Sequence, residues 1–207
     1  MNRIIIHWTA GTHKVSATDR KHYHFIIDGD GGMALGNMKP EDNLNTADGS
    51  YAAHTRGANT GAIGIAVAAM HGAQERPFKT GNYPITEKQV AALVAQCARL
   101  ALQYKIPVRR STILTHAEVE RTLGIKQAGK WDIVWLPGMA GVGDAIVIGD
   151  TLRRRISQAM APVAPPWIVV DHKPPVSAPQ APPAIEIPAI TFPSWLDRFR
   201  AWITGKA

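Results

Sequence analysis

Residues 3–10 read Arg3-Ile4-Ile5-Ile6-His7-Trp8-Thr9-Ala10, a short β-rich run that leads into a histidine. A second β-rich run, Ser111-Thr112-Ile113-Leu114-Thr115, is followed directly by His116. Further along the chain comes Gly129-Lys130-Trp131-Asp132. Two imidazoles and one carboxylate can supply three metal ligands, and a catalytic zinc site keeps a fourth position open for water. The pattern therefore predicts a candidate metal site, but the spacing alone does not show that the three side chains meet.

These residues also have ordinary structural interpretations. A single histidine after a strand is more often a polar strand-end residue than a ligand, and the chain contains no HExxH or CxxC spacing. The single cysteine, Cys97, excludes an internal disulfide framework. Cys97 falls on the apolar stripe of an expected helix, so we expect a buried core residue there and not a nucleophile.

Length and charge restrict the class of protein. The chain has 207 residues, of which 45% are hydrophobic, enough for one folded domain with an appendage. The formal net charge of +7 favours anionic partners: nucleic acid, acidic polymers or membranes. No base-reading motif is visible, so no nucleic-acid partner is expected. No stretch has the length of a membrane-spanning helix.

The order of elements predicts an α/β fold with a mixed central β-sheet flanked by helices. Strands are expected at residues 3–8, 23–28, 62–69 and 112–115. Residues 33–59 are expected to form a loop with one short strand.

Helix signals are fewer. Thr86-Glu87-Lys88-Gln89 has a capping-box pattern and predicts a helix that runs to about Lys105. Residues 119–135 are expected to form a long functional loop. A last helix is expected from Asp150 through Ser157, with the arginines at 153–155 exposed.

The composition changes at about Met160. Ten of the 15 prolines lie between residues 162 and 193, as in a semi-extended linker. The apolar residues after this stretch recur at helical spacing. We therefore expect a domain at residues 1–160, a linker at 161–193 and a short amphipathic helix at 194–207. This helix can contact a membrane surface, the folded domain or another chain through Trp195, Phe199 and Trp202.

Five blocks of sequence, in order, resemble the type-2 N-acetylmuramoyl-L-alanine amidases, the family of amidase-type phage lysozymes and peptidoglycan recognition proteins. They are residues 4–10, residues 22–31, residues 53–59 with Ile63-Gly64-Ile65, residues 114–119, and residues 129–132. The resemblance covers roughly residues 1–155. It implies the fold that zinc amidases share with peptidoglycan recognition proteins.

The resemblance also implies roles for individual residues. It implies Zn²⁺ as the cofactor, with His7, His116 and Asp132 as its ligands. Tyr23 and Lys130 match positions that assist catalysis, and a phenol hydroxyl and an ammonium are groups that can stabilise an oxyanion. A zinc ion with these ligands activates water and polarises an amide carbonyl.

Two further positions match the substrate groove of the family, His54 and Asn59. The chain also departs from the family pattern in two places. Ala66-Val67-Ala68 stands where many members carry a glutamate, which some active phage members also lack. The segment between His116 and Asp132 is longer than in compact members, so the shape of this loop does not carry over.

The implied function is that of an endolysin of phage or prophage, which hydrolyses the amide bond between N-acetylmuramic acid and L-alanine in peptidoglycan or muropeptides. Two alternatives stay open: a non-catalytic peptidoglycan-binding module of the same fold, and a cytoplasmic muropeptide-recycling amidase. The apolar run Ile4-Ile5-Ile6 is too short for a signal peptide and runs directly into His7. We therefore expect synthesis in the cytoplasm and action on the cell wall after release.

Overall fold

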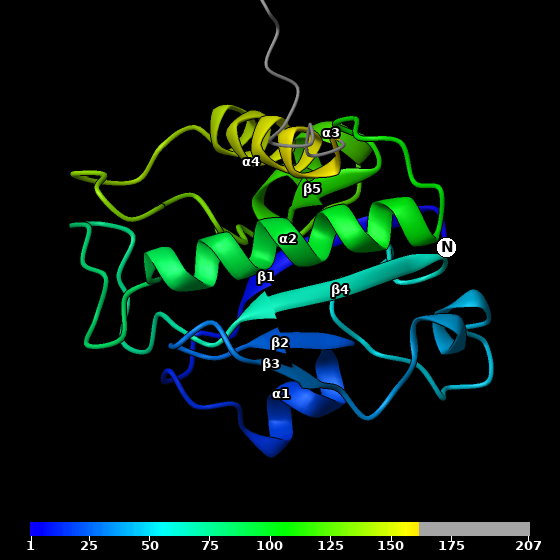
Figure 1. Cartoon of the computed structure of the whole chain (residues 1–207). Coiled ribbons are helices and arrows are strands. Elements are labelled where there is room, and N and C mark those ends of the chain that lie inside the picture. The colour runs from blue at the N-terminus through cyan, green and yellow to red at the C-terminus, as the bar shows by residue number, and fades with distance from the viewer. Residues whose placement is uncertain (162–207) are drawn as a thin grey trace, which may run out of the picture. The chain divides into compact units, whose positions relative to one another are not determined.

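The structure is a computed structural model, and it describes residues 1–161 (Figure 1). In chain order the elements are β1 (Arg3–Trp8), α1 (Ala17–His22), β2 (Phe25–Ile27), β3 (Met33–Leu35), η1 (Pro40–Leu44), β4 (Ala62–Val67), α2 (Glu87–Gln103), β5 (Ile113–Thr115), η2 (His116–Glu118), α3 (Val119–Leu123) and α4 (Ala145–Met160). The expected linker and amphipathic helix, with Trp195, Phe199 and Trp202, lie outside the described residues. The division at residue 160 therefore stays a prediction.

The five strands form one mixed sheet in the order β3-β2-β4-β1-β5. Strand β3 pairs antiparallel with β2 at one edge, and the other neighbouring pairs are parallel. Helices α2 and α4 lie next to each other on one side of the sheet (Figure 1). The predicted α/β class and mixed sheet are confirmed.

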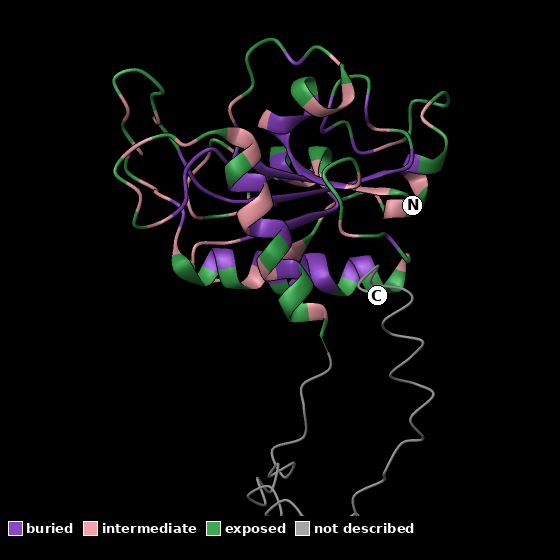
Figure 2. Ribbon diagram, turned by 90° about the horizontal axis from the view of Figure 1, so that it is seen from above, coloured by how far each residue is buried: buried purple, intermediate pink, exposed green. Residues whose placement is uncertain are grey.

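The side chains of β1 alternate between the two faces of the sheet. Ile4, Ile6 and Trp8 belong to the large core that α2 and α4 cover. Ile5 belongs instead to a small second cluster with Leu114 and with Val119 of α3. Strands β1, β2, β4 and β5 are buried almost throughout (Figure 2), whereas the edge strand β3 is largely exposed. Because alternation repeats every second residue, the side chain after Ile6 points to the same face as Ile5.

Helix α2 begins where the sequence predicts. Thr86 is its N-cap: the Thr86 hydroxyl accepts the Gln89 N–H, and the Gln89 side chain accepts the Thr86 N–H. The helix ends at Gln103, close to the expected Lys105. Cys97 is fully buried in the core, and burial raises the pKa of its thiol to about 12. Its expected role as a core residue is confirmed.

The predicted start of the last helix is wrong. Helix α4 begins at Ala145, because the Asp144 carboxylate accepts the free N–H groups of Ile146 and Val147. Asp150 lies inside the helix, where its carboxylate pairs with Arg110 and Arg153 instead of capping.

The expected exposure of the arginine run holds only for Arg154, because Arg153 is buried and Arg155 is half-buried. Arg153 is only 6% exposed, and its guanidinium donates to both carboxylate oxygens of Glu118 and to the Ile113 carbonyl. Gly149 makes room for this pair, since a Cβ there would collide with the Glu118 carboxylate. Arg154 is exposed, as expected. The pair therefore fastens α4 to β5 and to the turn that follows it.

Two helices are missing from the sequence prediction. Ser16 caps α1 in a box with Asp19, a short pattern that the sequence does contain. Helix α3 occupies the first part of the segment expected to be a long loop, so that expectation is wrong for Val119–Leu123. Within residues 1–161, no helix combines the length and apolarity that crossing a membrane requires.

Candidate metal centre

The sheet register places two histidines side by side. Strand β1 pairs in parallel with β5, and Ile6 is the register partner of Thr115. His7 follows Ile6, and His116 follows Thr115. The two histidines therefore lie together at the carboxyl ends of neighbouring strands. On the other side of β1, His7 pairs with Ala66 of β4.

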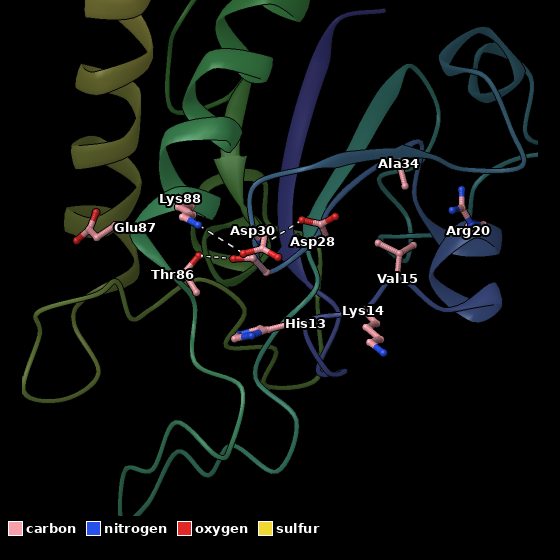
Figure 3. Close-up of a pocket in the computed structure, with 11 residues that line it drawn as sticks. His13, Lys14, Val15, Arg20, Asp28, Asp30, Ala34, Thr86, Glu87 and Lys88 are labelled. Carbon is pink, nitrogen blue, oxygen red and sulfur yellow. Dashed lines mark hydrogen bonds and ion pairs between the residues drawn. The ribbon is translucent and has the colours of Figure 1, made fainter.

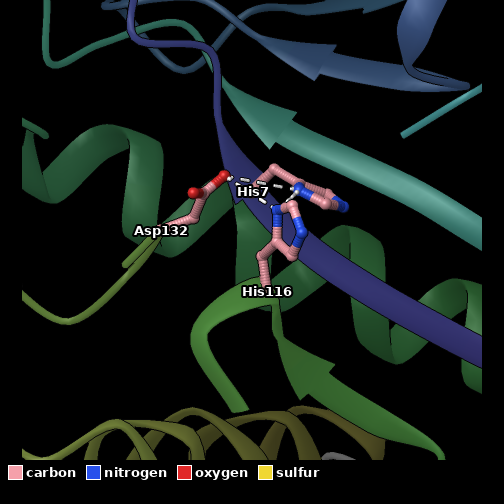
Figure 4. A group of neighbouring side chains, drawn as sticks. All are labelled: His7, His116 and Asp132. Carbon is pink, nitrogen blue, oxygen red and sulfur yellow. Dashed lines mark hydrogen bonds and ion pairs between the residues drawn. The ribbon is translucent and has the colours of Figure 1, made fainter. Parts of the chain in front are cut away.

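Asp132 reaches the same point from the segment after α3. The Asp132 Oδ2 atom lies 3.3 Å from His116 Nδ1 and 3.5 Å from His7 Nδ1, and the two Nδ1 atoms are 3.0 Å apart (Figure 4). The next residue, Ile133, has a φ of +63°. Such a backbone is rare for a β-branched residue, so the turn that delivers Asp132 is strained.

Burial and hydrogen bonds within the cluster together set its charge. His7 is fully buried, and His116 and Asp132 are 5% and 8% exposed. Burial lowers the pKa of His7 to about 4, although Asp132 opposes the shift. Burial raises the pKa of Asp132, but its hydrogen bonds with His116 and His7 outweigh this effect and hold the pKa below its ordinary range. At neutral pH the cluster thus offers a neutral imidazole and a carboxylate, the forms that bind metal ions.

The cluster fits a metal ion by its donor chemistry. One donor atom from each of the three residues lies within 4.8 Å of the other two. Two nitrogens and one oxygen form a donor set that zinc accepts, and three protein ligands are the number found in catalytic zinc sites.

The second ring nitrogen of His7 also has partners. His7 Nε2 lies 3.3 Å from Thr55 Oγ1 and 3.3 Å from His54 Nδ1, and these two atoms are 2.8 Å apart. Contacts of this kind hold the ring of a metal-binding histidine in place. Gly64 gives His54 its space, because a Cβ there would lie 2.5 Å from the imidazole ring.

The second ring nitrogen of His116 contacts a different residue. His116 Nε2 lies 2.9 Å from the side-chain oxygen of Gln127, which is 6% exposed. Gln127 comes from the segment after α3, between Leu123 and Asp132. Both histidines of the cluster are therefore held from behind by side chains of neighbouring loops.

A groove of about 520 Å³ opens beside the cluster, and Tyr23 and Lys130 line it. Tyr23 is half-buried, with its ring centre 5.1 Å from that of His7. Burial, and then the negative charge of Asp132, raises the pKa of the Tyr23 hydroxyl. Tyr23 therefore stays protonated at neutral pH and can donate a hydrogen bond. Lys130 is exposed at the rim.

His54 and Asn59 also line this groove. The Asn59 side-chain oxygen accepts the backbone N–H groups of His54 and Thr55 at 3.1 and 2.8 Å, so this oxygen holds the shape of the loop. Because His54 is 7% exposed and sits behind His7, its ring contacts His7 more than the solvent. The predicted substrate contacts of both residues stay predictions.

A second cavity, of about 670 Å³, lies elsewhere, between the segment before α1, the β2–β3 turn and the start of α2 (Figure 3). Several of its polar groups are paired within the protein. His13 donates to the Pro84 carbonyl, the Asp28 carboxylate accepts two backbone N–H groups of its own turn, and Lys88 pairs with Asp30. None of the residues predicted for the site lines it.

Sequence reasoning did not find two residues of this centre, Thr55 and Gln127. Thr55 and its partner His7 are 48 positions apart, and Gln127 and its partner His116 are 11 apart across a helix and a loop. No fixed spacing links such pairs, so the sequence carried no signal for them. The buried pair of Glu118 and Arg153 escaped for the same reason.

The sequence model of the N-acetylmuramoyl-L-alanine amidase family matches residues 1–134 of the chain. A comparison with curated protein sequences found no match.

Several solved structures are similar to the chain. One is the N-acetylmuramoyl-L-alanine amidase LysC from Clostridium intestinale, with 20% identity and a TM-score of 0.38, over 60% of this chain and 86% of LysC. Another is the amidase AmiD from E. coli in complex with anhydro-N-acetylmuramic acid-L-Ala-D-gamma-Glu-L-Lys, with 18% identity and a TM-score of 0.42, over 57% and 49%. A third is bumblebee PGRP-SA, with 19% identity and a TM-score of 0.40, over 57% and 71%.

Proposed function

The chain belongs to the type-2 N-acetylmuramoyl-L-alanine amidase family, and on that premise we propose that it is a zinc-dependent hydrolase of peptidoglycan. The bond that it cleaves is the amide between N-acetylmuramic acid and L-alanine. The observation that carries the proposal is the buried group of His7, His116 and Asp132 beside an open groove.

These three side chains would hold the zinc ion. Their imidazoles are fixed from behind by Thr55 and Gln127, so little reorganisation is needed on binding. When bound, zinc supplies Lewis acidity toward an amide carbonyl and a nucleophilic water at neutral pH.

The remaining work belongs to the groove residues. Tyr23 keeps its proton and can donate a hydrogen bond to the oxygen on which negative charge develops. Lys130, at the rim of the groove, can place a positive charge on the same side. Two donors that act on the developing charge, and not on the ground-state carbonyl, raise kcat more than they change substrate binding.

The charge of the groove favours an anionic substrate. Its lining includes the cations Arg56, Lys126 and Lys130, while its carboxylate, Asp132, belongs to the metal cluster. The chain as a whole has a net charge of +7. Peptide stems with free carboxylates and acidic wall polymers suit both features. The cationic lining of the groove and the net positive charge of the chain therefore support an endolysin that acts on intact cell wall.

Digestion of purified peptidoglycan with and without a chelator tests this function. We expect new free N-terminal alanine and no new reducing sugar ends. The chelator should abolish the reaction, and added zinc should restore it. Reducing ends would instead identify a glycosidase. Binding without any product would identify a recognition module, and cleavage restricted to soluble muropeptides would identify a recycling amidase.

A further inference from the structure

We propose that Gln127 is a positioning residue that selects which ring nitrogen of His116 faces the metal. It would also tie one wall of the groove to that ligand. The inference rests on the proposed zinc site, and it concerns a residue in the segment between α3 and Asp132.

The orientation of the Gln127 amide follows from two backbone carbonyls. The amide nitrogen lies 2.9 Å from the Arg56 oxygen and 3.2 Å from the Ile125 oxygen. Carbonyl oxygens only accept hydrogen bonds, so the NH₂ group must be on this side of the amide. The amide oxygen consequently faces His116.

The amide oxygen in turn determines the tautomer of His116. It lies 2.9 Å from His116 Nε2 and has no hydrogen to donate. His116 Nε2 must therefore carry the hydrogen, which leaves the lone pair of the neutral ring on Nδ1. His116 Nδ1 is the atom 3.3 Å from Asp132 Oδ2 and 3.0 Å from His7 Nδ1. The Arg56 and Ile125 carbonyls thus orient the Gln127 amide. That amide in turn leaves Nδ1 of His116 to face the metal.

Gln127 is itself held from a further side. Its backbone N–H donates to the Glu120 carboxylate of α3 at 3.0 Å. Its sequence neighbours Lys126 and Ala128 line the groove, as does Arg56, whose carbonyl it binds. A change at Gln127 therefore affects the metal ligand and the groove wall together, whereas a change at Glu120 affects the loop without removing the contact to His116.

Zinc affinity of the full chain, measured by competition with a chelating dye, tests the role of Gln127. Gln127→Leu keeps a similar volume but loses the acceptor, and we expect it to weaken zinc binding by about 10–100-fold. Glu120→Ala removes only the loop contact and is expected to bind zinc like the wild type. Gln158→Leu, at an exposed position of α4, is the control for the substitution itself.

A second measurement requires no variant. In the zinc-loaded wild type labelled with ¹⁵N-histidine, NMR should show a slowly exchanging hydrogen on His116 Nε2. A hydrogen on Nδ1 would overturn the inference. So would wild-type affinity in Gln127→Leu, or an equal loss in Glu120→Ala, which would assign the effect to loop shape. A wild type that binds no zinc would contradict the proposed function itself.

Discussion

The two faces of the sheet differ in what they bury. Toward α2 and α4, the strands present branched and aromatic side chains such as Ile4, Ile6 and Ile65. Toward the other face, the same strands present Ile5 and Leu114 together with small or polar residues such as Gly64 and His7. One face is a continuous apolar core, and the other joins a small apolar cluster to a group of buried histidines.

This difference shows how a single strand serves two purposes. Burying imidazoles and a carboxylate is unfavourable unless they find partners. Burial of the apolar face stabilises the fold through the hydrophobic effect. The polar face therefore need only satisfy its own hydrogen bonds. We therefore expect changes on the apolar face to lower stability and leave zinc binding intact. Changes on the histidine face should weaken zinc binding and leave the fold intact.

The largest effect should come from His116→Ala on the histidine face. We expect zinc and activity to be lost completely, because the two remaining donors cannot hold the ion against water and buffer. The metal-free variant should still fold. Elemental analysis and thermal melting measure both properties, with His71→Ala, at an exposed position, as the control. Undiminished zinc in His116→Ala would remove this residue from the ligand set.

The next effect is expected on the opposite face, from Arg153→Met. This change leaves the buried Glu118 carboxylate without its partner and should lower the free energy of unfolding by about 3–5 kcal/mol. Zinc bound to the folded fraction should be unchanged. Urea unfolding of this variant is best compared with that of Arg154→Met, one position along the same helix but exposed. Equal losses in both variants would mean that the buried pair contributes little.

A smaller effect, confined to the rate, is expected from Tyr23→Phe and Lys130→Ala. Each removes a donor near the developing oxyanion and should lower kcat by about 10²–10³-fold, with zinc retained. Steady-state kinetics on soluble muropeptides and zinc analysis distinguish the possible roles. Wild-type kcat would show that these side chains only pack or face solvent, and loss of zinc would show a structural role.

The smallest effect should follow from ending the chain after Met160. Both faces of the sheet, and all the groove residues, lie before this point. We therefore expect residues 1–160 to fold with a Tm close to that of the full chain and to hydrolyse soluble muropeptides. Thermal melting of both lengths measures this. A large fall in Tm would show that later residues pack on the domain and that the predicted boundary is misplaced.

Much of the local structure was predictable because its causes are local. The capping box of Thr86 and the helical stripe through Cys97 predicted α2. The apolar runs before His7 and His116 predicted β1 and β5. At Asp150 the sequence alone led to the wrong cap, because this carboxylate pairs with Arg110 and Arg153 while Asp144 caps the helix.

The sequence by itself determined the residue types at the strand ends, and its resemblance to the amidases indicated which of them to group. Only the tertiary structure decided that His7 and His116 share a register, that Arg153 is buried, and that Gln127 contacts His116. The physical reason is the range of the interactions involved. Caps and alternation act within a few residues, whereas strand register and buried polar contacts exist only after the whole sheet has excluded water.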